Sequence, residues 1–427
     1  MSEAADRTPI LVDCDTGIDD SLALLYAVAS QDCELVAVTC TAGNVDARQV
    51  AENTRAVLEL AGRPDVEVAL GRKTPLVRAL VTTPETHGPR GIGYAELPPA
   101  TMPLSPRFSP DLIVGEARRR PGELTLVTLA PLTNVALAIL REPELPRLLR
   151  RLVVMGGSYR SPGNTAPTTE WNVSVDPEAA RIVFEAFGPG AAEGPASTES
   201  SAAAPPSARP LALGLDVTER AKMLPEHLAA LASRAGCEAD GSIGGISVTL
   251  GVSGSLGVSG SLGVSGGPGG PGGPGGPGGP DGSIGAAGSG GSGGSGGPGG
   301  SVGSGGGALG AYASVGSSVN PIVRYLADAL RFYMEFHSRY DGFYGAFIHD
   351  PLALATALDP TLVRTEPLTV DVELGGRLTT GETVTDWRRV WGRPPNVDVA
   401  VEADSARFMA RFIERVGDLA ARRASRR

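Results

Sequence analysis

An acid-rich turn after the first apolar run of the chain constrains the fold most. Residues 8–12 have the character of a short buried strand, and residues 21–27 that of the first turns of a helix. Between these two segments lie four carboxylates: Asp13, Asp15, Asp19 and Asp20. Ligands of open α/β sheets bind where strands end and turn into helices. We therefore expect a ligand site at this turn.

Four carboxylates this close together repel one another and require a positive partner. A helix N-terminus offers typically under about 1 kcal/mol to each charge, whereas a divalent cation offers far more. Hard cations such as calcium or magnesium take all-oxygen ligand sets. A plainer interpretation makes Asp19 or Asp20 a helix cap after the turn at Gly17. The two acids upstream favour the metal.

The following segments predict the architecture. Residues 34–41 and 66–70 form further strands, and apolar residues recur at helical spacing over 50–61. This alternation predicts an α/β fold: a Rossmann-like, open, mostly parallel sheet with helices on both faces. Asn44 follows the second strand, so we expect it close to the acids. Further strands are predicted over residues 124–129, 152–157, 211–218, 368–374 and 396–401.

Composition limits the possible partners and the compartment. The net charge of −10 argues against a nucleic-acid or anionic-membrane partner. Residues 1–6 lack signal-peptide character, and no segment has the apolar length of a membrane span. The cysteines show no metal-type spacing and suit reduced thiols, which predicts a cytoplasmic protein; they are Cys14, Cys33, Cys40 and Cys237.

Two low-complexity segments interrupt the pattern. Residues 188–210 are rich in Ala, Pro, Ser and Gly, and residues 236–318 are dominated by Gly, Ser and Pro. Between residues 241 and 310 the only charged residue is Asp281. Such sequence cannot bury enough apolar surface to offset its backbone entropy. We therefore predict one domain over residues 1–427, with a short insertion and a disordered loop inside it.

Three motifs resemble a known family, the inosine-uridine preferring nucleoside hydrolases, which are calcium-dependent N-ribohydrolases. Residues 13–20, Asp-Cys-Asp-Thr-Gly-Ile-Asp-Asp, are similar to its amino-terminal signature. Residues 164–172 match its Asn-x5-Glu-x-Asn ribose loop, and residues 349–351, His-Asp-Pro, match its last calcium-binding motif. The resemblance implies hydrolysis of the N-glycosidic bond of a small ribonucleoside, and a homo-oligomer, either a dimer or a tetramer.

The resemblance also assigns metal-binding and catalytic roles. It implies a Ca²⁺ site formed by Asp15, Asp20, Asp350 and the backbone carbonyl of Leu129. Asp15 would also act as the general base. Asp13 would help to orient the metal ligands without binding the metal itself. His349, together with His87 in a loop over residues 86–93, would protonate or hydrogen-bond the departing base. A plainer interpretation makes Asp350 a helix cap and His349 an ordinary turn residue.

Substrate contacts are assigned in the same way. The implied ribose contacts are Asp19, Asn44 and Asn172 at the 2′ and 3′ hydroxyls, Asn164 and Glu170 at the 5′ end, and Met155 under the ring. For the base we expect a pocket built from Phe336, His337, Tyr340, Phe343 and Tyr344. Aromatic faces stack on purines and pyrimidines alike. Base preference therefore stays open.

Two other classes of protein compete with this hypothesis. Asp13-Cys14-Asp15 after a strand also resembles the magnesium-dependent phosphatases of the haloacid dehalogenase type, whose first Asp is a nucleophile. That pattern has Thr or Val where this chain has Gly17, and it predicts no Asp19-Asp20 pair. A ribose-binding or nucleoside-binding protein without turnover would not need metal, base and acid together.

Overall fold

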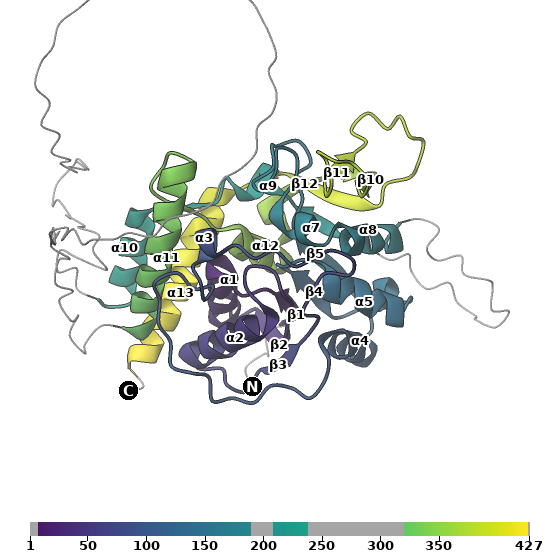
Figure 1. Ribbon diagram of the computed structural model, residues 1–427. Coiled ribbons are helices and arrows are strands. Elements are labelled where there is room, and N and C mark those ends of the chain that lie inside the picture. The colour runs from purple at the N-terminus through teal and green to yellow at the C-terminus, as the bar shows by residue number, and fades with distance from the viewer. Residues whose placement is uncertain (1–6, 189–207, 238–319, 426–427) are drawn as a thin grey trace, which may run out of the picture. The chain divides into compact units, whose positions relative to one another are not determined.

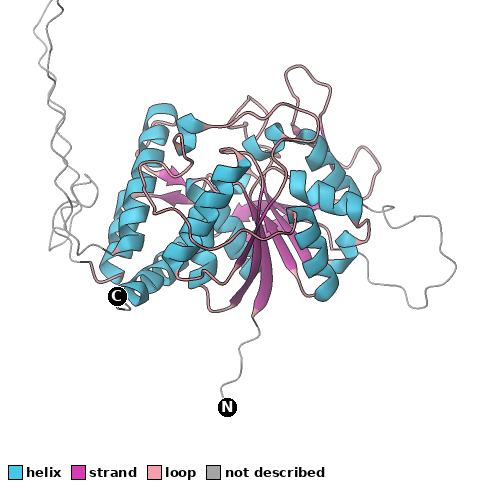
Figure 2. Ribbon diagram, turned by 60° about the horizontal axis from the view of Figure 1, so that its bottom comes forward, coloured by secondary structure: helices cyan, strands magenta, loops and turns pink. Residues whose placement is uncertain are grey.

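A large β-sheet organises the residues that the computed structural model describes, 7–188, 208–237 and 320–425 (Figure 2). Its strands are β1 Thr8–Cys14, β2 Cys33–Cys40, β3 Glu67–Leu70, β4 Thr125–Thr128, β5 Arg151–Met155, β6 Leu211–Leu213, β9 Val363–Leu368 and β12 Val397–Ala403. They lie in the order β3-β2-β1-β4-β5-β6-β12-β9, and neighbours are parallel except at the antiparallel edge strand β9. The first six follow the Rossmann order. The predicted fold class is confirmed.

Helices cover both faces of this sheet (Figure 1). One face packs against α1 Ile18–Ala29, α2 Ala47–Ala61, α10 Pro225–Arg234, α11 Pro321–Tyr340, α12 His349–Leu358 and α13 Ser405–Ala424, and the other against α4 Ser109–Arg119, α5 Thr133–Arg141 and α8 Pro177–Ala186. Side chains alternate along β1: Ile10 and Val12 belong to the first apolar cluster and Leu11 to the second. The two-residue period therefore builds two cores from one strand.

Shorter elements complete the fold and correct two expectations. They are α3 Pro84–His87, α6 Leu145–Leu148, α7 Trp171–Val175, α9 Leu215–Thr218, β7 Lys222–Met223, β8 Ala346–Phe347, the 3₁₀ turn η1 Pro360–Leu362, β10 Val370–Val372 and β11 Thr383–Thr385. The strand expected over residues 211–218 ends at Leu213, because the Gly214 carbonyl accepts from the N–H of Thr218 and closes a helical turn. His87 ends the helix α3 rather than lying in a loop, because Pro84 suits the first helical turn.

Strong caps fix the start of helix α11, where the described residues resume after the long insertion. The Asn320 side chain accepts from the N–H groups of Ile322 and Val323 at 3.0 and 3.3 Å, and Pro321 occupies the first helical position. The Asn320 amide also donates to the carbonyl of Ala420 at 2.7 Å, which ties α11 to α13. The described helices on either side of the long insertion, α10 and α11, both pack into the same apolar cluster on one face of the sheet.

Two predictions fall mostly outside the described residues. Of the insertion predicted over 188–210, only residues 188 and 208–210 are described, and of that predicted over 236–318, only 236 and 237. Within the described ranges, no helix combines the length and the apolarity needed to cross a bilayer.

Candidate active site

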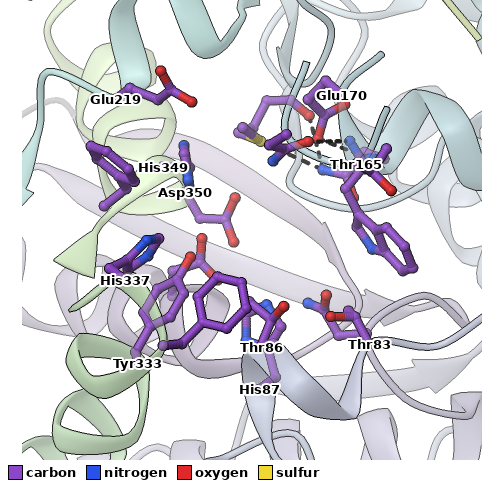
Figure 3. A pocket seen from close by; sticks show the side chains of 18 of the residues that line it. Thr83, Thr86, His87, Thr165, Glu170, Glu219, Tyr333, His337, His349 and Asp350 are labelled. Atoms are coloured by element: carbon purple, nitrogen blue, oxygen red, sulfur yellow. Dashed lines mark hydrogen bonds between the residues drawn. The ribbon is translucent and has the colours of Figure 1, made fainter. Parts of the chain in front are cut away.

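A cavity of about 520 Å³ opens at the carboxyl ends of the central strands (Figure 3). Its lining includes Asp19 after β1, Asn44 after β2, Leu129 after β4 and Met155 at the end of β5. Its size falls within the range of small-molecule sites in proteins. The structure therefore brings together the strand ends that the sequence analysis singled out.

Three buried carboxylates meet beside this cavity. Asp19, Asp20 and Asp350 each offer one oxygen, and these oxygens all lie within 4.8 Å of one another. The first two open α1, whereas Asp350 lies in the first turn of α12, which packs against α1. Ile348 is the N-cap of α12, so the interpretation of Asp350 as a cap is wrong. The structure also places Asp19, which was expected to bind ribose, in this carboxylate group.

Burial makes these acids hard to ionise without a cation. Loss of hydration raises the pKa of Asp350 well above its usual value, and the nearby Asp19 and Asp20 raise it further. The pKa of Asp19 is raised in the same way, by burial and then by Asp20. Asp20 itself accepts from the N–H groups of Asp15 and Gly17 at 3.1 and 2.9 Å. Asp20 therefore pairs with backbone N–H groups at the start of α1, and its carboxylate also belongs to the cluster.

Asp15 lies next to the cluster with one oxygen fixed and one free. Its Oδ2 accepts from the Asn44 N–H at 2.7 Å, and the Asn44 amide donates to Asp20 at 3.3 Å. Its Oδ1 is buried and has no hydrogen-bond partner among the described residues. A Cβ added at Gly43 would overlap the Asp15 carboxylate, so the turn must be glycine here. A buried oxygen in this state suits a cation or a bound water.

The Leu129 carbonyl is held at the edge of the cavity by its neighbours. The N–H of Leu129 donates to the carbonyl of Asp13 at 2.8 Å, which fixes this turn against β1. The Asn172 amide donates to the carbonyl oxygens of Leu129 and Met155 at 3.0 and 3.2 Å. Asn172 therefore ties the predicted ribose loop to two strand ends.

The Asp13 side chain lies behind the site rather than in it. It accepts from the Thr39 hydroxyl at 2.6 Å and from the Asn134 amide at 2.8 Å, and burial raises its pKa to about 7. It is fully buried and is absent from the cavity lining. The supporting role of Asp13 toward the metal ligands stays a prediction.

The predicted ribose loop forms one wall of the cavity. Asn164, Glu170 and Asn172 all line it. The Glu170 carboxylate accepts from the N–H groups of Gly157, Asn172 and Val173 at 2.9, 2.8 and 3.1 Å, and so caps α7. Asn164 accepts from the N–H of Trp171 at 3.0 Å. The loop is thus preorganised by its own backbone before any ligand binds.

Two histidines from distant parts of the chain also reach the cavity. His87 Nδ1 accepts from the N–H of Ile18 at 3.1 Å, and His349 Nδ1 hydrogen-bonds to the Thr218 hydroxyl at 2.8 Å. Burial lowers the pKa of each to about 3. Both rings are therefore neutral at neutral pH.

An aromatic wall faces the ribose loop across the cavity. Tyr333, Phe336, His337 and Tyr340 repeat at helical spacing on α11, and Phe347 follows on β8; all line the cavity. Of the expected base-pocket residues, Phe343 and Tyr344 are not among the lining residues. Phe343 instead stacks on His337, with 5.6 Å between ring centroids. Tyr333 and Phe347 were missed, although the α11 spacing could have indicated Tyr333. Figure 3 shows Tyr333 and His337 on one side and Glu170 on the other.

Comparison with known proteins shows which family this chain resembles. Residues 10–410 match the family model described as inosine-uridine preferring nucleoside hydrolase. A pyrimidine-specific ribonucleoside hydrolase, RihA of Enterobacter sp. (strain 638), is 30% identical over 416 residues, covering 97% of this chain and 99% of the relative. A solved purine-preferring ribonucleoside hydrolase from Gardnerella vaginalis is 25% identical with a TM-score of 0.69, covering 97% and 99% of the two chains.

These matches do not favour the phosphatase or the binding-protein alternative, because the relatives are ribonucleoside hydrolases and the match extends across both insertions. The carboxylates from both ends of the chain, the ribose loop and the aromatic wall lie around one cavity. The chain belongs to the inosine-uridine preferring nucleoside hydrolase family and is an N-glycosyl hydrolase.

Proposed function

We propose that this hydrolase cleaves ribonucleosides to free base and ribose with Ca²⁺ bound at the acid cluster. The observation that carries the proposal is the convergence of Asp19, Asp20 and Asp350 within 4.8 Å, with all three buried. Ca²⁺ takes six to eight oxygen ligands, and carboxylates and backbone carbonyls are typical ones. The proposed ligands are Asp15, Asp20, Asp350 and the carbonyl of Leu129, with Asp19 close enough to contribute.

Asp15 is the proposed general base. Bound Ca²⁺ would lower the pKa of a water molecule and orient the ribose hydroxyls. The N–H of Asn44 holds Asp15 Oδ2, so the carboxylate keeps its orientation while Oδ1 is free to accept the proton of the attacking water. As the water oxygen bonds to the anomeric carbon, the glycosidic electron pair leaves with the base, which then takes up a proton.

The ribose is proposed to lie between the acid cluster and the loop over residues 164–172. Asp19, Asn44 and Asn172 would bind the 2′ and 3′ hydroxyls, Asn164 and Glu170 the 5′ end, and Met155 would lie under the ring. The support is that all of these residues line the cavity. Asn172 donates through its Nδ2 to two carbonyls, which leaves its Oδ1 for a sugar hydroxyl.

Base preference has to be decided by experiment. The relatives differ by name, one pyrimidine-specific and one purine-preferring. The wall formed by Phe336, Tyr340 and Phe347 can stack on either class of base.

We also propose that the protein is cytoplasmic and that it associates with copies of itself. Cys14, Cys33 and Cys40 are buried as free thiols, which supports a cytoplasmic location. A homo-oligomer, dimer or tetramer, is proposed from the family resemblance.

The decisive assay is a panel of purine and pyrimidine ribonucleosides with and without EDTA. We expect equal amounts of free base and reducing sugar, loss of activity in EDTA, and recovery on addition of Ca²⁺. Phosphate release from phosphoesters without nucleoside cleavage would instead support the phosphatase hypothesis. Tight nucleoside binding with no product would support a binding protein.

A further inference from the structure

A third histidine in the cavity has a partner that the other two lack. His337 lies in the last turn of α11, and Asp341 follows one turn later as the C-cap residue. The Asp341 Oδ2 lies 2.7 Å from His337 Nδ1. His87 pairs with a backbone N–H and His349 with a hydroxyl. Among these three rings, His337 is the one paired with a carboxylate.

The other ring nitrogen of His337 is free to meet a ligand. Nε2 is buried and has no hydrogen-bond partner among the described residues, and His337 as a whole is only 5% exposed. Because the Asp341 carboxylate accepts a hydrogen bond from Nδ1–H, Nε2 is an acceptor in the neutral ring and a donor in the charged ring. A buried nitrogen in a ligand cavity pairs with the ligand or with a water molecule.

Aromatic rings hold His337 in place on several sides. Its ring centroid lies 4.6 Å from that of Tyr333, 5.3 Å from Phe336, 4.8 Å from Phe347 and 5.6 Å from Phe343. The same wall is the one expected to stack on the base. Nε2 is therefore held close to where the base, rather than the ribose, would lie.

We propose that His337, oriented by Asp341, donates a proton or hydrogen bond to the departing base through Nε2. The inference rests on the proposed function and adds His337 as a proton donor at the base, beside His349 and His87, to which the resemblance assigned that role. As the glycosidic bond breaks, its electron pair moves to the base, the Nε2 proton moves to a base nitrogen or oxygen, and a neutral ring remains bonded to Asp341. The water proton goes separately to Asp15, so solvent restores both groups after each turnover.

Opposing effects act on the charge of the His337 ring. Burial lowers its pKa, and the Asp341 carboxylate opposes that effect. The groups that face it are Asp341, Lys222, Tyr333, His87 and His349. Lys222 disfavours the charged ring, and its ammonium lies 4.5 Å from the centroid of Phe343, the ring that stacks on His337. Of these groups, Asp341 favours the imidazolium, and so does the carboxyl end of α11, in whose last turn His337 lies.

The test compares leaving groups that need a proton with one that does not. Nucleosides lose a poorly stabilised base, whereas p-nitrophenyl β-D-ribofuranoside loses p-nitrophenolate, which departs without protonation. We expect His337→Phe and His337→Gln to lower kcat on nucleosides by roughly 10² to 10⁴, the usual contribution of general acid catalysis. On the p-nitrophenyl riboside we expect a loss of less than about fivefold, because the remaining machinery is unchanged.

Asp341 is tested as a positioning residue by pH dependence. Because the acid must be protonated, activity on nucleosides falls as pH rises through the His337 pKa. Asp341→Asn removes the charge that favours the imidazolium, so this alkaline limb should move to lower pH. The His337 imidazole signals in NMR should titrate at lower pH in the same variant, independent of turnover. Asp328→Asn on the same helix, beside Arg324 at 3.8 Å, is the matched control and should change neither.

The outcomes separate this inference from the proposed function. Equal losses on both substrate types would mean that His337 only shapes the pocket, and full activity of both His337 variants would place the donor elsewhere; either result overturns the inference. His227→Gln, outside the cavity on α10, controls for the loss of a histidine. A wild-type protein that cleaves no nucleoside would refute the proposed function itself.

Discussion

Asp20 and Asp350 place carboxylate oxygens within 4.8 Å of each other, although one lies in the first strand–helix turn and the other begins α12, beyond the long insertion. The contact arises because α12 packs directly against α1. Burying two carboxylates this close together without a cation costs stability, because either both stay charged and repel or one must be held protonated at a raised pKa. Stability and metal binding are thus coupled at one point of the fold.

Removing one of these charges should have opposite effects on the metal-free and metal-bound protein. In EDTA, Asp350→Asn should raise Tm, by roughly 2–4 °C per kcal/mol of repulsion relieved. At a Ca²⁺ concentration a hundred times Kd, binding should stabilise the wild type by about 2.7 kcal/mol and so raise its Tm. The Tm of the variant should not respond to Ca²⁺. Differential scanning calorimetry with and without Ca²⁺ measures both. Asp111→Asn, in an exposed ion pair with Arg141, is the control.

A lower Tm of Asp350→Asn in EDTA would show that the carboxylate stabilises the metal-free fold and would contradict the repulsion argument. An unchanged response to Ca²⁺ would remove Asp350 from the proposed ligands.

A single methyl group at the turn after β2 should disable the general base. Gly43→Ala would drive a Cβ into the Asp15 carboxylate, and overpacking of this kind typically costs about 1–3 kcal/mol. We expect kcat to fall at least about tenfold, since small misplacements of catalytic groups are costly. Gly115→Ala in α4 is the matched control, because its Cβ would meet Arg107 at an ordinary 3.5 Å. That substitution should preserve activity and stabilise the helix by about 0.5–1 kcal/mol. Wild-type kcat in Gly43→Ala would show that Asp15 can move without loss.

Part of the stability that the protein loses at acidic pH should come from Asp359, at the junction of α12 and α13. The Asp359 carboxylate accepts from Thr361 and from Arg411, which lowers its pKa to about 2. A carboxyl whose folded pKa is depressed stabilises the protein above its unfolded pKa, near 4, and this contribution is lost as pH falls towards 2. Asp359→Asn should therefore cost about 1 kcal/mol at pH 7 and progressively less between pH 4 and pH 2.

Urea unfolding of wild type and Asp359→Asn across this pH range measures the difference directly. A difference that stays constant from pH 7 to pH 2 would mean that the charge of Asp359 contributes nothing and that only its packing counts.

The long insertion should be dispensable if the protein is one domain, as we propose. Excision of residues 241–310 leaves residues 238–240 and 311–319, which can span up to roughly 40 Å when extended. The helices on either side, α10 and α11, pack against each other, so the gap to be bridged is short. We expect kcat and Tm close to those of the full chain. Loss of folding or a large fall in kcat would show that the insertion contributes to the core or to the site.

Much of the fold could be predicted because its signals are local. Apolar runs that lead into turns marked β1, β2, β4 and β5, and the alternation with helices predicted a mostly parallel sheet. The strand expected over 211–218 was wrong beyond Leu213, because an apolar run that short fits a strand or a helical turn equally well.

By itself the sequence determined that acids, amides and histidines follow strand ends in an α/β fold, and hence that a site exists there. Only the tertiary structure decided which carboxylates converge, that Asp19 joins Asp20 and Asp350, and that one oxygen of Asp15 stays without a partner. It also decided that the aromatic wall surrounds the buried Nε2 of His337. The reason is physical: periodicity and capping depend on neighbours in sequence, whereas burial, charge repulsion and unpaired atoms depend on which distant helices pack together.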